Sequence, residues 1–306
     1  ATIKPHALND CFTCGNVLCA KSVKVKPAAT SSTTYLLDFS RKEVNDYITS
    51  KIADEDTLIS SVDSPLKAEF KPTFLVRKTL LDHIKQYFNR KGNVFVQQQD
   101  YLTTLAARMA KRIPVTATHL VISQQLLPYF MELGVIGGRT FDVVMTRLPF
   151  AQLHKRLDFA LQLHPSSSTL NDFRVEDSLI ELENEGLKKA LRIITTHAEI
   201  ADLYPEKSQL LNFSIKESGR MVRMSRGKIN VLFPSSLLAR KGALFLHELK
   251  TSFDFNLFIA GKATENENIF NALNAQLFDG DMSCIDLIIS PTYVDHYPIH
   301  LVNGLR

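Results

Sequence analysis

The chain has 306 residues, and 45% of them are apolar, which is enough to bury a core in each of two domains. This composition excludes a mainly disordered protein. The 36 basic residues against 32 acidic ones leave a net charge of only +4. That balance excludes a protein that coats nucleic acid through many phosphate contacts, so no specific nucleic-acid partner is expected.

The apolar stretches of the sequence indicate where in the cell the protein is expected. The longest one, Leu120 to Gly138, is interrupted by polar residues, so it contains no run of about 20 apolar residues that could cross a bilayer. No secretory signal is readable at the N-terminus. We therefore expect a cytoplasmic protein, and contact with a membrane surface stays open.

The four cysteines are too few for a disulfide framework, and the spacing of three of them leaves a metal centre as the less favoured alternative to free thiols. Three of the four, Cys11, Cys14 and Cys19, cluster near the N-terminus, where His6 is the only nearby candidate for a fourth ligand. Structural zinc sites usually take two pairs of ligands. Free thiols and no bound metal are therefore expected.

The first half of the chain shows a βαβ rhythm. Short apolar runs predict strands, and apolar residues at helical spacing predict helices. The expected elements are a strand at Tyr35–Phe39, a helix at Leu75–Phe88, a strand at Val94–Val96, a helix capped by Asp100 that ends before Pro114, and a strand at Val115–Thr118. Strand, helix and strand joined by short connections are typical of a parallel sheet.

A second such unit follows a long intervening region. Residues Leu120 to Asp177 are too many for a plain connection, so they are interpreted as a helical insertion with a helix at Leu148–Leu163. Ser178 and Glu181 then fit a capping box before a helix that runs to Leu191, and Arg192–Thr195 is the next strand.

A basic segment marks the expected domain boundary. Residues Lys216 to Lys228 hold five basic side chains and two glycines, and they are interpreted as a linker between domains 1–215 and 229–306. Beyond it the alternation resumes, with strands at Ile229–Phe233, Phe255–Ala260 and Ile285–Ser290 and helices at Lys241–Ser252 and Glu267–Leu277. The sequence therefore predicts an α/β protein with two Rossmann-like parallel-sheet domains facing a crevice.

The sharpest candidate site is the loop between Phe233 and Gly242. It places Arg240 and Lys241 beside a helix N-terminus, where backbone N–H groups and the helix dipole already favour an anion. A guanidinium and an ammonium together suit a diphosphate. The alternative is a solvated basic loop.

These motifs, in this order, resemble the B-type glycosyltransferases, which have two Rossmann-like domains. The resemblance is carried by Arg240-Lys241-Gly242 after a strand, then Leu257–Gly261, then Asp286–Pro291, then Asp295 to Asn303, with Pro114–His119 and Glu185–Ile200 in the first half. It leans toward the retaining nucleotide-sugar families. It implies transfer of a sugar from a nucleoside-diphosphate sugar to an unidentified glycan, lipid or protein acceptor, without a cofactor or metal ion.

The resemblance also implies roles for individual residues. Arg240 and Lys241 hold the donor diphosphate, Gly261 and Asn303 contact the ribose and sugar, and His119 and Asp295 are catalytic, with His119 expected at a strand end. Asn303 stands where the family often has a carboxylate, which puts the donor preference in doubt. His197, at the end of the next strand, is a weaker candidate, and Arg139, Asp142 and Arg147 are expected in a loop of the insertion.

Two further expectations qualify this interpretation. The chain stops inside the helix expected after Asp295, so the second domain is expected to be incomplete. The alternative function is a non-catalytic protein of the same fold that acts in binding or assembly through the basic surface at Lys216–Lys228.

Overall fold

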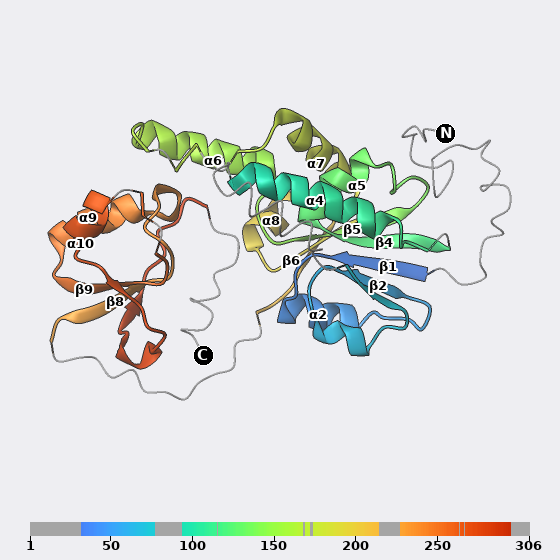
Figure 1. Cartoon of the computed structure of the whole chain (residues 1–306), viewed down its shortest axis with the longest axis horizontal. Coiled ribbons are helices and arrows are strands. Elements are labelled where there is room, and N and C mark those ends of the chain that lie inside the picture. Colours follow the sequence, from blue (N-terminus) through green and yellow to red (C-terminus); the bar gives the residue numbers. More distant parts are fainter. Residues whose placement is uncertain are drawn as a thin grey trace. The chain divides into compact units, whose positions relative to one another are not determined.

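The computed structural model describes residues 32–76, 94–114, 116–167, 169–171, 174–213, 227–262, 264–265 and 267–294. The chain divides into two compact units (Figure 1). Unit 1 comprises Ala1–Phe150 and Val175–Ser214, and unit 2 comprises Ala151–Arg174 and Ile215–Arg306. The division at Ser214 and Ile215 lies beside the boundary expected from the sequence, whereas the membership of 151–174 in unit 2 was not expected.

Unit 1 is built on a seven-stranded parallel sheet. Its strands are β1 (Ser32–Leu37), β2 (Thr57–Ser60), β3 (Thr73–Leu75), β4 (Ala117–Ser123), β5 (Thr140–Met145), β6 (Arg192–Thr195) and β7 (Ser208–Leu210). The spatial order is β3-β2-β1-β4-β5-β6-β7. This is the doubly wound order, in which the connections run outward on both sides from the β1/β4 pair.

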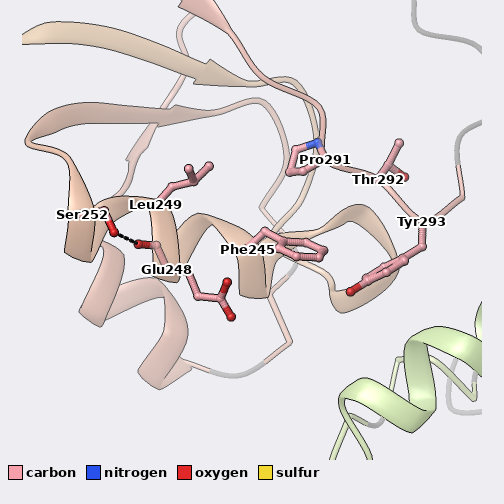
Figure 2. Close-up of a pocket in the computed structure, with 7 residues that line it drawn as sticks. All are labelled: Phe245, Glu248, Leu249, Ser252, Pro291, Thr292 and Tyr293. Atoms are coloured by element: carbon pink, nitrogen blue, oxygen red, sulfur yellow. Dashed lines mark hydrogen bonds between the residues drawn. The ribbon is translucent and has the colours of Figure 1, made fainter.

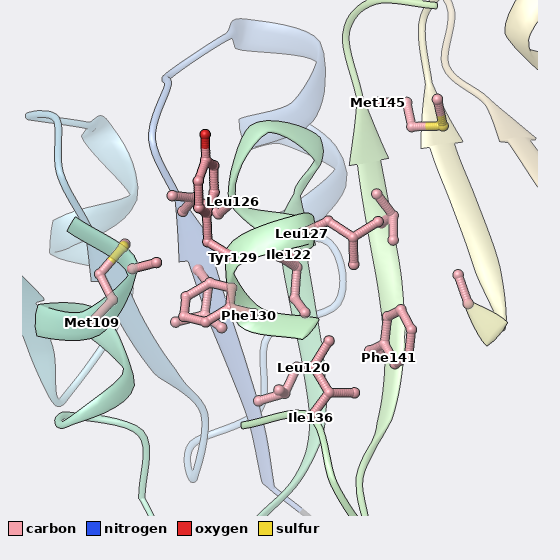
Figure 3. Close-up of a cluster of buried hydrophobic side chains, with 14 of the residues drawn as sticks. Met109, Leu120, Ile122, Leu126, Leu127, Tyr129, Phe130, Ile136, Phe141 and Met145 are labelled. Carbon is pink, nitrogen blue, oxygen red and sulfur yellow. The ribbon is translucent and has the colours of Figure 1, made fainter. Parts of the chain in front are cut away.

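Both faces of this sheet are buried, because apolar residues alternate between two cores. Leu36, Leu120 and Ile122 point into one core, and Leu37 and Val121 point into the other. The first core is covered by α4 (Val94–Ala110), η2 (Gln124–Leu126), α5 (Leu127–Glu132), α7 (Asp177–Lys189) and α8 (Ala198–Leu203), and the second by α2 (Lys42–Thr49) and η1 (Pro65–Ala68). Figure 3 shows the first core, where α5 lies against β4 and β5.

Unit 2 holds a smaller parallel sheet. Its strands β8 (Ile229–Phe233), β9 (Phe255–Ile259), β10 (Gln276–Leu277) and β11 (Leu287–Ile288) have the spatial order β10-β9-β8-β11. The remaining elements are η3 (Ala239–Lys241), α9 (Ala243–Ser252), α10 (Glu267–Leu273), η4 (Met282–Cys284) and the body of α6 (Phe150–Leu163). Alternate strand residues Val231, Phe233, Leu257 and Ile259 pack with Leu246 of α9 in its core.

The prediction of an α/β protein with two parallel sheets is confirmed. The strand at Arg192–Thr195 and the strand at Ile229–Phe233 have the predicted bounds, and α6 and α9 lie where helices were predicted. Within the described ranges, no helix combines the length and the apolar character needed to span a membrane.

Several predicted elements are wrong. Val94–Val96 begins helix α4 rather than forming a strand, so Asp100 lies inside that helix and does not cap it. Ser178 likewise lies inside α7, whose N-cap is Glu176 and makes no side-chain capping bond. The predicted helix at Glu267–Leu277 ends at Leu273, and its last two residues form β10.

The predicted insertion at 120–177 is also wrong. Its first half contains most of β4 and all of β5, two central strands of the unit 1 sheet. Asp142 broke the apolar run of β5 in the sequence, but in the fold its carboxylate is buried and pairs with Arg192. The helix predicted at 75–88 lies almost wholly outside the described residues, and Leu75 itself belongs to β3.

Candidate functional site

The candidate site lies at the point in the unit 2 sheet where the order of strand addition reverses. Chain order takes β8 to β9 and β10 on one side, and then β11 returns to the other side of β8. Parallel sheets bind ligands at such a switch point, beyond the carboxyl ends of the strands. The two segments that meet there are the loop after β8, residues 234–242, and the segment after β11, residues 289–294.

Arg240 and Lys241 lie at this switch point. The carbonyl oxygen of Arg240 accepts hydrogen bonds from the backbone N–H groups of Tyr293 (3.2 Å) and Val294 (3.4 Å) and from the hydroxyl of Thr292 (3.2 Å). The Nζ of Lys241 donates to the carbonyl oxygen of Val294 at 3.3 Å. The segment after β11 therefore contacts both basic residues at the carboxyl edge of the sheet, and their role in binding a diphosphate stays a prediction.

Two glycines allow the loops at this edge to approach closely. Gly242 has φ +87° and caps α9, and a Cβ added there would lie 2.1 Å from the carbonyl oxygen of Pro291. A Cβ on Gly261, directly after β9 and Ala260, would lie 2.0 Å from the Oγ of Ser236. Only glycine fits at either position without displacing a neighbour. Gly261 thus lies at the predicted edge, where the structure gives it a packing role, and its predicted contact with ribose or sugar stays a prediction.

A pocket of about 580 Å³ adjoins this loop (Figure 2). It runs along α9 and is closed on one side by the segment after β11. Its lining consists of Phe245, Glu248, Leu249, Ser252, Pro291, Thr292 and Tyr293. The rings of Phe245 and Tyr293 have centroids 5.5 Å apart, so the pocket offers aromatic surface and one carboxylate. Two of its lining residues, Thr292 and Tyr293, donate hydrogen bonds to the backbone of Arg240.

The carboxyl edge of unit 1 carries a residue that the sequence analysis missed. Asp38 directly follows β1, and Ser123 ends β4, so both lie at the switch point of the larger sheet. Within the described ranges, Oδ1 of Asp38 is buried and has no hydrogen-bond partner. Burial raises the pKa of Asp38, and this outweighs the lowering effects of Ser123, Arg147 and Arg41. A run ending in Leu-Leu-Asp-Phe gave the only sequence signal, a carboxylate directly after a buried strand.

His119 does not lie where it was predicted. It is the third residue of β4, a strand that continues to Ser123, so it belongs to the amino end of the sheet rather than to a strand end near the switch point. Its Nδ1 lies 2.8 Å from the Oγ1 of Thr140, and its Nε2 lies 3.3 Å from Oδ2 of Asp142. These contacts give His119 a structural role between two strands.

The other predicted residues of the first half divide similarly. Arg139 lies in the loop directly before β5, as predicted, where it is buried and donates to the carbonyl oxygens of Ala117 and Val135. Asp142 is also buried, but it lies within β5 and not in a loop. His197 does follow the carboxyl end of β6, as the N-cap of α8. The remaining predicted positions, Asp295, Asn303, most of the linker 216–228 and the Cys11–Cys19 cluster with His6, lie outside the described residues and stay predictions.

Arg147 lies in a buried network at the carboxyl edge of unit 1. Its Nη2 is 2.8 Å from Oε1 of Glu183, which also accepts from Nε2 of Gln124 at 3.1 Å. The other oxygen of Glu183 accepts from the backbone N–H of Phe150, the first residue of α6, at 2.5 Å. One carboxylate on α7 therefore fixes the segments that follow β4 and β5.

Comparisons with known proteins add structural neighbours at low identity. A scan against protein-family models finds no match, and a search of curated proteins finds no significant relative. Among solved structures the chain is similar to Anabaena HepE in complex with UDP and glucose, at 11% identity and a TM-score of 0.47, over 90% of this chain and 78% of that one.

Two other solved structures are similar to a lesser degree. They are Medicago truncatula UGT71G1 complexed with UDP-glucose (9% identity, TM-score 0.41, 85% of this chain and 76% of that one) and CalG4, the calicheamicin glycosyltransferase (11% identity, TM-score 0.37, 82% and 71%).

Proposed function

We propose that this protein is a glycosyltransferase that binds a nucleoside-diphosphate sugar through Arg240 and Lys241 and passes the sugar to a glycan, lipid or protein acceptor. The observation that carries the proposal is the position of residues 240 and 241, which end η3 directly before the N-terminus of α9 and lie at the switch point of a parallel sheet. A diphosphate is the anion that suits a guanidinium and an ammonium on adjacent residues.

The chemistry of sugar transfer explains why two fixed cations are useful. When the bond between the sugar and the diphosphate breaks, negative charge develops on the leaving phosphate. Arg240 and Lys241 stabilise that charge in place, so the departure needs no metal ion. The pocket beside them, with Phe245 and Tyr293, gives the nucleoside an aromatic surface.

On unit 1, we propose Asp38 rather than His119 as a catalytic residue, with the role of accepting a proton. A buried carboxylate with a raised pKa holds a proton more tightly near neutral pH than an exposed one, which suits it to take the proton of an acceptor hydroxyl. A base on the acceptor favours a single displacement with inversion at the sugar carbon. The family resemblance implies retention instead, and the anomeric configuration of the product, read by NMR, distinguishes the two.

The donor site is tested first by thermal unfolding with UDP, GDP, ADP and TDP at millimolar excess. A ligand at about 100 times its dissociation constant adds roughly 2.7 kcal/mol to stability. At least one nucleotide is expected to raise the midpoint of the wild type, and Arg240→Ala and Lys241→Ala are expected to reduce that rise.

Lys228→Ala is the matched control. It removes the same charge as Lys241→Ala. However, Lys228 precedes β8 and pairs with Asp254, which precedes β9, so this ion pair lies at the amino edge of the same sheet. Its nucleotide response is expected to equal that of the wild type. A wild type that responds to none of the four nucleotides, or an equal loss in Lys228→Ala and Lys241→Ala, would overturn the proposed donor site.

A further inference from the structure

Glu265 gathers hydrogen bonds from two segments that are far apart in the sequence. Its Oε1 accepts from the hydroxyl of Ser167 at 2.5 Å and from the backbone N–H of Thr169 at 3.3 Å. Its Oε2 accepts from the hydroxyl of Thr169 and from the backbone N–H of Ala239 at 3.0 Å. The carboxylate thereby ties the turn after α6 to the first residue of η3.

The same carboxylate lies at the start of the basic loop. Ala239 is followed directly by Arg240 and Lys241, and Leu237 accepts a backbone hydrogen bond from Glu265 at 2.7 Å. Burial alone would raise the pKa of Glu265, but the hydrogen bonds from Ser167, Thr169 and the backbone lower it below its usual value. Glu265 is therefore an ionised group whose oxygens are directed at loop and turn donors.

Helix α6 and the turn after it also contact the other segment at the switch point, the one after β11. Nε2 of His164 lies 3.2 Å from the hydroxyl of Tyr293, and Nη1 of Arg156 donates to the carbonyl oxygen of Tyr293 at 3.4 Å. Residues Arg156, His164, Ser167 and Thr169, which we call the brace, thus contact the segment after β11 directly and the loop after β8 through Glu265. Both segments that meet at the switch point are held by one stretch of chain.

We propose that Glu265 is a positioning residue that, with the brace, fixes Arg240 and Lys241 in the geometry that binds a diphosphate. This inference rests on the proposed function. A loop held in its binding conformation loses less conformational freedom when the ligand arrives, so each contact with the phosphates contributes more to affinity. Glu265 itself touches no substrate.

The sign of the effect separates positioning from simple electrostatics. Glu265→Gln removes a negative charge close to two cations, and if only long-range charge mattered, an anionic ligand would bind more tightly to the variant. If Glu265 positions the loop, the variant binds more weakly, because a glutamine has one acceptor oxygen and its amide group cannot accept from Ala239 or Thr169.

The test compares diphosphates with monophosphates by calorimetry. UDP, GDP, ADP and TDP and their monophosphates are titrated into the full chain and into Glu265→Gln. The variant is expected to bind the diphosphate that the wild type prefers about tenfold more weakly, while its affinity for the matching monophosphate changes less than about twofold. Loss of stability alone would not change the ratio of diphosphate affinity to monophosphate affinity. Glu265→Asp should restore part of the affinity for the diphosphate.

Two further variants in the brace complete the design. Ser167→Ala removes one donor to Glu265 and leaves the hydrogen bond from Ala239, so it should weaken diphosphate binding by about two- to threefold. If Glu265→Gln does not fold, Ser167→Ala tests the positioning role in its place. Asp158→Asn breaks the ion pair of Asp158 with Arg174, which lies on the same stretch of chain, and should change neither affinity.

The outcomes are distinguishable. Weaker diphosphate binding in Glu265→Gln and Ser167→Ala, with Asp158→Asn unchanged, supports the inference. Unchanged or tighter diphosphate binding in Glu265→Gln, or equal losses for diphosphate and monophosphate, overturns it and leaves the donor site standing. A wild type that binds no nucleotide overturns the proposed function itself.

Discussion

Replacing Glu183 by alanine should destabilise unit 1 strongly, because it leaves a buried positive charge without its partner. The side chain of Glu183 is fully buried, and its oxygens accept from Arg147 at 2.8 Å, from Gln124 at 3.1 Å and from the N–H of Phe150 at 2.5 Å. The side chain of Arg147 is 5% exposed, so water cannot replace the lost carboxylate.

The expected magnitude follows from these contacts. Removing one partner of a buried ion pair costs about 3–5 kcal/mol. For a unit of about 150–250 residues each kcal/mol lowers the melting temperature by about 2–4 °C, so the midpoint of Glu183→Ala should fall by roughly 6–20 °C. Thermal unfolding followed by circular dichroism measures it, with urea unfolding as a second determination of the free energy.

Glu185→Ala is the control on the same helix. Glu185 pairs with Lys189 one turn later, and both side chains are substantially exposed, so this change should cost no more than about 0.5 kcal/mol. A loss in Glu183→Ala below about 1 kcal/mol, or equal to that of Glu185→Ala, refutes the reasoning. Replacing Arg147 by Met in the Glu183→Ala background should recover part of the loss, because the unpaired charge is then gone.

Three other predictions concern the switch points and the core. Asp38→Asn should abolish sugar transfer while leaving the nucleotide response intact. Because burial raises the pKa of Asp38, protonation of this carboxylate stabilises the wild type. The wild type should therefore melt at a lower temperature than Asp38→Asn at pH 7.5, and this difference should shrink as the pH falls toward 4. A pH-independent difference would contradict this. Gly261→Ala should cost about 1–3 kcal/mol and weaken nucleotide binding, since its Cβ would meet Ser236, whereas Gly227→Ala, with open space around it, should do neither. Phe130→Ala should cost about 3–5 kcal/mol by thermal unfolding, and a loss near that of a surface change would argue against its buried position.

The loop that carries Arg240 and Lys241 was predictable from the sequence because its signal is local. A basic pair beside a glycine, after a buried strand and before a helix, occupies one short stretch of chain, and η3 and α9 follow β8 as that pattern indicates. The same holds for β6 and β8, whose apolar runs, Ile193-Ile194 and Val231-Leu232-Phe233, each follow a polar residue. A parallel strand that is buried on both faces shows such a run whatever lies beside it.

Elements whose identity depends on distant partners were not predictable. Val94–Val96 has the residue types of a strand, yet it begins α4, since three residues are too few for either period to show. Asp142 interrupts the apolar run of β5, so the sequence of β5 does not look like that of a buried strand. Asp142 can be buried because β6 and β4 bring the guanidinium of Arg192 and the ring of His119 next to its carboxylate. The sequence near Asp142 does not predict those partners.

The sequence by itself determined the α/β class, the alternation of strands and helices around residues 192–195 and 229–259, and the basic pair Arg240-Lys241. The tertiary structure decided which strand ends meet at a switch point, and therefore that Asp38 rather than His119 lies at such an edge. It also decided that Glu265 joins the turn after α6 to the basic loop. The physical reason is that apolar periodicity is written in neighbouring residues, whereas the pairing of buried polar groups depends on strand order and on contacts about a hundred residues apart along the chain.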